Sequence, residues 1–252
     1  MKRALGLYAA GLYAFLHLPL AVLAAFSFNV SRFTVWEGFS LDWYRALFRD
    51  QQLAEAAWNS LVIAVVSTAL STAIGTLCSY GLWKRRDRAV SGALYLSLVT
   101  PEIVMGVSLL AFFQWTFRYL GLQLGMHTVI LAHVAFSIAY VVVVVSARLR
   151  TFDAALEEAA MDLGATEWQA FRLVTLPVLR PGIIAAALLA LTVSFDDYVI
   201  TSMVAGVDSE TLPMWMYATA RRGASPVLNA ISALIVTGFG ALVLVSERMQ
   251  KA

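Results

Sequence analysis

The chain has 252 residues, of which 60% are hydrophobic and only 13% are charged, and its formal net charge is +2. A water-soluble domain of this length would carry about a quarter charged residues, so the composition excludes an ordinary soluble globule. The small net charge gives no indication of nucleic-acid binding. With a mean hydropathy of +0.76, the sequence instead predicts an all-α protein that crosses a membrane several times.

Six apolar runs are long enough to span the hydrocarbon core as helices, for which about 20 residues are needed. They lie near Leu5–Ser27, Trp58–Trp83, Ser91–Phe117, Thr128–Ala147, Gly182–Ala205 and Val227–Ser246. The first run follows Met1-Lys2-Arg3, as a secretory signal would. Its length and the lack of a clear cleavage site favour a retained helix.

Lys and Arg are concentrated on one side of the predicted membrane. If the N-terminus is cytoplasmic, the inner segments hold 12 of the 18 basic residues and the outer segments hold 6. Because cytoplasmic loops carry an excess of Lys and Arg, both termini are predicted to lie inside. The turn Trp83–Arg88, with four basic residues, is the strongest single indication.

The lengths of the connections suggest how the chain is divided. We expect the first helix and an outer segment over residues 1–53, a transmembrane domain over 54–246 and a cytoplasmic tail over 247–252. The outer segment mixes aromatic and charged residues and predicts a short interfacial helix. The inner segment 149–180 is far longer than a turn requires.

The first half of this inner segment predicts a short amphipathic helix. From Asp153 to Leu163, small or apolar residues recur at helical spacing. The acidic residues occupy other faces; they are Asp153, Glu157, Glu158 and Asp162. Gly164 then suits the position that ends a helix, where a positive φ costs glycine little.

The second half predicts another helix and completes an elbow. Thr166 and Gln169 have the capping-box pattern that begins a helix, which we expect to end before Leu176-Pro177. Pro181 is then expected in the first turn of the fifth membrane helix. A rigid helix–Gly–helix elbow suits a lever that another protein grips. The alternative is an amphipathic hairpin lying on the bilayer.

Fixed positions in this elbow resemble the EAA loop of bacterial ABC-importer permeases, E-A-A-x3-G-x9-I-x-L-P. In this chain the motif reads Glu158-Ala159-Ala160, Gly164 and Val174-Thr175-Leu176-Pro177, with valine at the isoleucine position. In that family the elbow inserts into a groove of a cytoplasmic ATPase and passes its motion to the membrane helices. The resemblance implies the type I ABC importer permease fold. It also implies an ATPase-docking loop made of Glu158, Ala159, Ala160, Gly164, Leu176 and Pro177.

The chain shows no catalytic chemistry of its own. None of its lysines (Lys2, Lys84 and Lys251) lies in a G-x-x-x-x-G-K-[ST] motif, so it has no P-loop for ATP. The single cysteine, Cys78, excludes an intrachain disulfide and a cysteine metal cluster. We therefore assign no catalytic residue, metal ligand or cofactor to this chain, and we expect ATP and Mg on a partner ATPase.

Three carboxylates fall at predicted membrane depth, where a charge costs from about 3 to more than 10 kcal/mol. Glu102 lies near the middle of the third span, next to Pro101, and Asp196-Asp197 lies in the outer half of the fifth. These acids are either structural or line a water-filled path for a cationic solute. No Lys or Arg lies at comparable depth, which favours the path. Tyr198 would then add a cation–π contact.

Two histidines, His17 and His133, lie alone on apolar faces. We interpret each as a packing residue or as a partner in hydrogen bonds between helices.

Beyond the loop, nearly the whole chain resembles the second permease subunit of spermidine/putrescine importers. The similar segments are Ser27-Phe28-Asn29, Ser31-Arg32-Phe33, Glu157–Thr166, Ser194–Tyr198, Thr211-Leu212-Pro213 and Ser225–Ala230. Two positions depart from the family: Glu102 replaces a common aspartate, and Phe195 replaces leucine or methionine. The resemblance implies a polyamine cargo and a bacterial inner-membrane location. It also implies three kinds of partner: a second permease, two ATPase copies and a periplasmic binding protein.

Two other functions remain open from the residues alone. The first is an ABC permease for another small solute, such as ferric iron, an anion or an amino acid derivative. Three acids argue against an anion but do not exclude the others. The second is a secondary transporter, since proton-coupled carriers also use buried carboxylates. Such folds usually show two related halves, which this sequence does not.

Overall fold

The computed structural model describes residues 2–31, 35–85, 87–223 and 226–251, and these are almost entirely helical. Arg32, Phe33, Arg86 and Ser225, which contribute to the sequence patterns above, lie outside the described residues. The chain divides into two compact units, Met1–Ala54 with Trp215–Ala252, and Glu55–Met214. Each unit is described separately.

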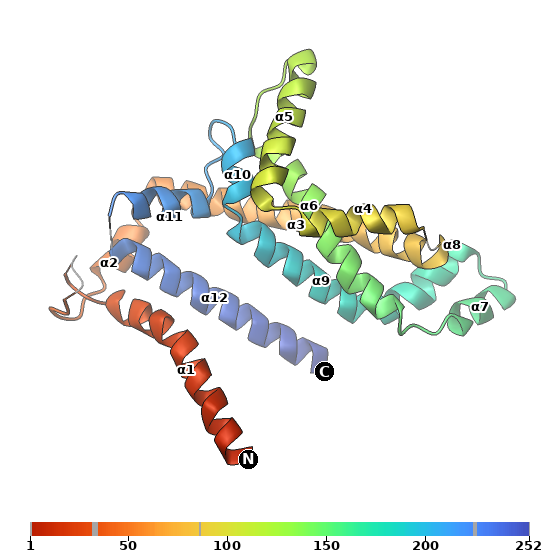
Figure 1. Cartoon of the computed structure of the whole chain (residues 1–252), viewed down its shortest axis with the longest axis horizontal. Coiled ribbons are helices and arrows are strands. Elements are labelled where there is room, and N and C mark those ends of the chain that lie inside the picture. Colours follow the sequence, from red (N-terminus) through yellow and green to blue (C-terminus); the bar gives the residue numbers. More distant parts are fainter. Residues whose placement is uncertain (1, 32–34, 86, 224–225, 252) are drawn as a thin grey trace. The chain divides into compact units, whose positions relative to one another are not determined.

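In the first unit, α12 (Pro226–Lys251) packs against both α1 (Lys2–Phe26) and α2 (Asp42–Leu47). Figure 1 shows these helices in red, orange and blue. The short helix predicted in the outer segment is confirmed as α2. It follows a turn held by the buried Asn29, whose side chain donates to the Val35 carbonyl (2.7 Å) and accepts from the Glu37 N–H (3.0 Å).

The second unit is built around α6, which contacts α4, α5, α9 and α10. Its elements, with the two helices that continue into the first unit, are α3 (Gln51–Arg85), α4 (Arg88–Val99), α5 (Glu102–Leu120), α6 (Met126–Leu149), α7 (Ala155–Asp162), α8 (Glu167–Ala170), the π-helix η1 (Phe171–Thr175), α9 (Leu176–Asp196), α10 (Val199–Val204) and α11 (Leu212–Arg221). Gly75 lets α3 approach α6 closely, because a Cβ there would lie 2.6 Å from Val141 Cγ1.

Within the described residues, five helical segments are long and apolar enough to cross a membrane. They are Leu5–Phe26, Gln51–Arg85, Glu102–Leu120, Met126–Leu149 and Glu167–Asp196. The sixth predicted span coincides with α12, of which the apolar part Pro226–Ala241 lies among the residues with described side chains. The prediction of a polytopic all-α protein is confirmed.

The prediction of one continuous third span is wrong. Helix α4 ends at Val99, Thr100 is extended (ψ 128°), and α5 begins after Pro101. A residue that precedes proline is sterically pushed out of the α region, which explains the break. Glu102 is therefore the first residue of a helix and does not lie in the middle of one.

The prediction for the fifth span is wrong at both ends. The helix continues from α8 through η1 into α9, so it neither stops before Leu176-Pro177 nor begins at Pro181. A proline ring normally meets the carbonyl four residues earlier, and the wider π-helical turn before Pro177 relaxes that contact. At the other end, α9 stops at Asp196 because Asp197 is extended (ψ 122°).

Candidate functional site

A cavity of about 580 Å³ lies in the second unit where two helix breaks meet. One wall comes from the break between α4 and α5, and another from the break between α9 and α10. Interrupted helices at membrane depth are tolerated where they line a cavity. All four residues predicted for the substrate pathway line it: Glu102, Asp196, Asp197 and Tyr198.

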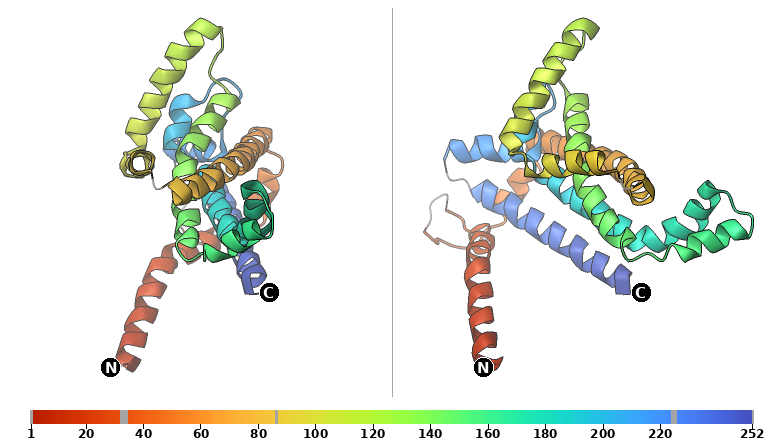
Figure 2. Two further views of the ribbon diagram at one scale, coloured as in Figure 1. Left: turned by 90° about the vertical axis from the view of Figure 1, so that its right-hand side faces the viewer. Right: turned by 45° about the vertical axis from the view of Figure 1, so that its right-hand side comes forward.

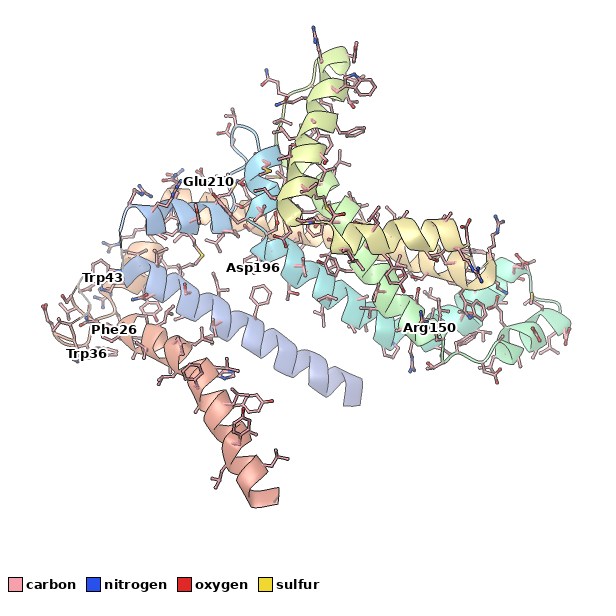
Figure 3. The ribbon with its side chains drawn as sticks, viewed as in Figure 1. Phe26, Trp36, Trp43, Arg150, Asp196 and Glu210 are labelled. Carbon is pink, nitrogen blue, oxygen red and sulfur yellow. The ribbon has the colours of Figure 1, made fainter. Side chains whose placement is uncertain are left out.

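Glu102 and Asp196 present exposed side chains to this cavity. Glu102 begins α5, where the positive end of the helix dipole stabilises a carboxylate. Asp196 is the last residue of α9, as Figure 3 shows. In the described part of the chain neither carboxylate has an ion-pair partner. A cation in the cavity would compensate both.

Asp197, the next residue, is held very differently. Its side chain is only 5% exposed, and Oδ2 accepts hydrogen bonds from the backbone N–H and the hydroxyl of Thr201, both at 2.8 Å. The same oxygen lies 3.4 Å from Nε2 of His133. The Asp197 carboxylate therefore fixes the start of α10, although the residue also lines the cavity.

His133, which is buried on α6, connects four helices around this break. Its Nδ1 lies 2.7 Å from the Ser194 hydroxyl of α9, and its Nε2 lies 2.9 Å from the Thr201 hydroxyl of α10. Ser194 in turn lies 2.9 Å from the Ser67 hydroxyl of α3. The prediction that His133 makes hydrogen bonds between helices is confirmed. Sequence reasoning missed its partners, which lie 61 and 68 residues away.

The predicted elbow is present, and Gly164 has the predicted role in its backbone. Gly164 has φ +93°, its N–H donates to the Met161 carbonyl (2.9 Å), and the Ala165 N–H donates to the Ala160 carbonyl (3.1 Å). These two bonds form a Schellman motif, which ends α7 and turns the chain. Figure 2 shows the elbow extending beyond the ends of α6 and α9.

The capping box that begins the second arm is also confirmed. The Gln169 N–H donates to the Thr166 hydroxyl (3.3 Å), and the Thr166 N–H donates to Oε1 of Gln169 (2.8 Å). Both orphan donors are thereby satisfied at the start of α8. The elbow is consequently rigid on both sides of its glycine.

The outer surface of the elbow combines exposed polar and apolar groups. Among the predicted docking residues, Glu158, Ala159, Gly164 and Pro177 are exposed, whereas Ala160 and Leu176 are half-buried. Large apolar side chains beside them are also exposed, namely Leu156 (50%), Leu163 (91%) and Trp168 (61%). These side chains leave apolar area uncovered on the elbow.

One elbow residue was assigned to the wrong environment. Glu157 was expected on a polar face of its helix, but its side chain is only 1% exposed. Lys84 Nζ lies 2.8 Å from Oε1, the Thr175 hydroxyl donates to Oε2 (3.0 Å), and the Tyr80 hydroxyl also donates to Oε1. Burial alone would raise the pKa of Glu157, but these hydrogen bonds and the Lys84 charge hold that pKa below its ordinary value.

Comparisons with known proteins agree with this geometry. Residues 71–252 match the family described as "Binding-protein-dependent transport system inner membrane component". The spermidine/putrescine transport system permease protein PotC of Haemophilus influenzae is 39% identical, over 93% of this chain and 91% of the relative. The putrescine transport system permease protein PotI of Escherichia coli is 41% identical, over 90% of this chain and 84% of the relative.

Solved structures support the fold. A bacterial ABC transporter involved in alginate import has a chain with a TM-score of 0.76 at 19% identity, covering 99% of this chain and 96% of its own. The methionine ABC transporter MetNI matches with a TM-score of 0.66 at 22% identity, covering 78% and 94%. The predicted type I permease fold is confirmed. On the family match and the extensive identity to these relatives, the chain belongs to the inner-membrane permeases of binding-protein-dependent ABC importers.

Proposed function

We propose that this chain forms half of the translocation pathway of an ATP-driven polyamine importer. The observation that carries the proposal is the pair of exposed carboxylates, Glu102 and Asp196, on one cavity. Putrescine and spermidine are chains of methylene groups with ammonium groups along them. Carboxylates attract the ammonium groups, and apolar walls such as Met105 and Phe136 accommodate the methylenes. The relatives named for spermidine and putrescine support the same cargo.

The four predicted pathway residues take different roles in this proposal. Glu102 and Asp196 contact ammonium groups, and the Tyr198 ring adds a cation–π contact. Asp197 is committed to Thr201 and His133, so it positions the helix break that presents Asp196. Binding then depends on Asp197 as well, because Asp197 fixes the break between α9 and α10 that places Asp196 at the cavity.

The elbow is the proposed docking point for the motor. We place Glu158, Ala159, Ala160, Gly164, Leu176 and Pro177 against a cytoplasmic ATPase. The exposed Leu163 and Trp168 supply apolar contact area. The chain itself then needs no ATPase site, because ATP and Mg are held by two copies of that partner. The excess of basic residues in the inner segments supports cytoplasmic termini.

The remaining partners are a second permease and a periplasmic binding protein. The family description specifies dependence on a binding protein, and a structural neighbour was solved in complex with a periplasmic protein. With a second permease, the cavity of this chain becomes one half of a pathway through the bilayer.

Reconstitution tests the proposal directly. The chain is placed in proteoliposomes with its partner permease, ATPase and binding protein, and uptake of labelled putrescine and spermidine is measured with and without ATP. We expect ATP-dependent uptake that unlabelled polyamine, and not ferric iron or a neutral amino acid, competes away. Uptake by the chain alone in vesicles without an ATPase would contradict the proposal and indicate a secondary transporter.

A further inference from the structure

A buried cluster joins the elbow to the membrane helices. It consists of Tyr80 and Lys84 near the end of α3, Glu157 on α7 and Thr175 at the end of η1, and we call these four residues the elbow latch. Both oxygens of Glu157 are occupied: Lys84 and Tyr80 contact Oε1, and Thr175 donates to Oε2. Three donors from two other elements therefore converge on one carboxylate.

The burial of Glu157 makes this arrangement specific. A carboxylate that is 1% exposed has lost its hydration, and only well-placed donors offset that cost. The Lys84 side chain remains 35% exposed, so its charge reaches water while Glu157 does not. A shift of α7 relative to α3 would leave the buried carboxylate without a partner, and the latch therefore resists such a shift.

Aromatic rings pack beside the latch. The Tyr80 ring lies 4.5 Å from the Phe171 ring, which lies 5.3 Å from the ring of Trp168 on α8. The Trp83 ring lies 5.8 Å from Phe152 at the start of the elbow, and Lys84 Nζ lies 5.2 Å from the Trp83 ring. Hydrogen bonds in such a buried site are stronger than in water.

The latch lies between the elbow and the start of α9, so a displacement of the elbow would reach the membrane helices through it. Thr175 directly precedes Leu176, the first residue of α9, and α9 ends at Asp196 in the cavity. Helix α9, which contains Pro181, has 21 residues and is about 30 Å long, so it connects the two places without a break. Helix α3 leads to the same region, because its Ser67 lies 2.9 Å from Ser194.

We propose that Glu157 is a positioning residue that makes α7, the inner end of α3 and the start of α9 move as one body. This inference rests on the proposed function, in which the push comes from an ATPase docked on the elbow. Glu158, the exposed neighbour, contacts the ATPase, whereas Glu157 passes the displacement inward. The docking residue and the transmitting residue are then neighbours in α7, of which Glu158 is exposed and Glu157 is buried.

The test separates transmission from docking by measuring the number of ATP molecules hydrolysed per polyamine imported. It uses the complete reconstituted importer with Glu157→Gln, which keeps the shape and removes the charge, and with Lys84→Met. We expect the ATPase to remain bound and active while uptake falls, so that this ratio rises roughly tenfold. Arg85→Met is the matched control, since Arg85 is the exposed basic neighbour of Lys84, and it should keep the wild-type ratio.

Two further variants keep the test decisive. The charge exchange Glu157→Lys with Lys84→Glu should bring the ratio back toward wild type relative to either single change, because the buried pair is restored. Tyr80→Phe removes one donor and should raise the ratio by a smaller factor. A wild-type ratio in Glu157→Gln would overturn the inference. Loss of the bound ATPase in all these variants would also overturn it, because Glu157 would then serve docking alone.

A spectroscopic measurement reads the latch itself. Spin labels are placed at Asp162→Cys on α7 and Arg85→Cys on α3, in a Cys78→Ala background. Glu157→Gln should broaden the distance distribution between them, and an unchanged distribution would count against the latch. If the wild-type importer carries no polyamine, the proposed function fails. If the wild-type importer carries polyamine and Glu157→Gln keeps the wild-type ratio of ATP hydrolysed to polyamine imported, only the present inference fails.

Discussion

The cavity and the elbow latch differ in whether their acidic side chains are exposed or are buried and hydrogen-bonded. At the latch, Glu157 is buried and receives three donors. At the cavity, Glu102 and Asp196 are exposed and have no ion-pair partner among the described residues. Asp197 lies at the cavity but resembles Glu157, because its carboxylate is buried and bonded. A carboxylate satisfied by its own chain holds structure, whereas an unsatisfied one is available to a ligand.

The largest expected effect on transport comes from changes in the elbow. We expect its function to depend on backbone shape, whereas the function of the cavity should depend on charge. Gly164→Pro should abolish uptake and ATPase coupling, because φ +93° is inaccessible to proline. Glu158→Lys should do the same by reversing a charge on the docking surface. Insertion into the membrane should be unchanged. Gly81→Ala on α3, where an added Cβ meets nothing within 4 Å, is the control. Normal transport by both elbow variants would remove the docking proposal.

At the cavity, polyamine uptake should depend on the charge of the acidic side chains and not on their shape. Asp196→Asn should lower uptake of putrescine roughly tenfold or more, since a hydrogen bond to a charged group contributes about 1.5–3 kcal/mol. Glu102→Gln should act in the same direction. The melting temperature of the purified protein should not fall in Asp196→Asn, because this carboxylate has no ion-pair partner within the described chain, and it should fall only slightly in Glu102→Gln, which loses the interaction with the α5 dipole. Unchanged uptake in both variants would make these acids structural.

Asp197, next to Asp196, should show the opposite pattern: its substitution should lower stability first and uptake only as a consequence. Asp197→Asn should cost about 1–3 kcal/mol of stability, because it weakens buried hydrogen bonds to Thr201 and the contact with His133. We expect a lower melting temperature, with any loss of uptake following from it. His133→Phe should lower the melting temperature similarly. If Asp197→Asn melts like the wild type yet stops transport, Asp197 belongs with the ligand-binding acids.

The smallest expected effect is a pH dependence from Glu157. Its pKa is lowered in the folded protein, so the latch stabilises the fold fully at pH values above the ordinary pKa of about 4.3. That stability is lost as the pH falls through the lower, folded pKa. The difference in melting temperature between wild type and Glu157→Gln should shrink as the pH falls below about 4.3. A difference that stays constant as the pH falls would contradict this prediction.

The local features of the elbow were predictable because each depends on neighbours in sequence. Gly164 ends a helix through bonds within its own turn, and the capping box joins Thr166 to Gln169. The two helix breaks were harder to place. Pro101 indicated a disturbance at its helix, but apolar length suggested continuity. The break after Asp196 depends on bonds from Asp197 to Thr201 and His133, of which only the first is local.

The sequence by itself determined the membrane class, the approximate positions of the spans and the elbow with its glycine, because hydrophobic length, helical periodicity and capping chemistry act over a few residues. Only the tertiary structure decided which acids are paired. Helical spacing places Glu157 on a polar face just as it does Glu158, and the sequence assigns Asp196 and Asp197 to the same pathway. Their partners decide their roles, and some of these lie far away in the chain, as Tyr80 lies 77 residues from Glu157. Packing must bring such partners together before a carboxylate is either satisfied or left for a ligand.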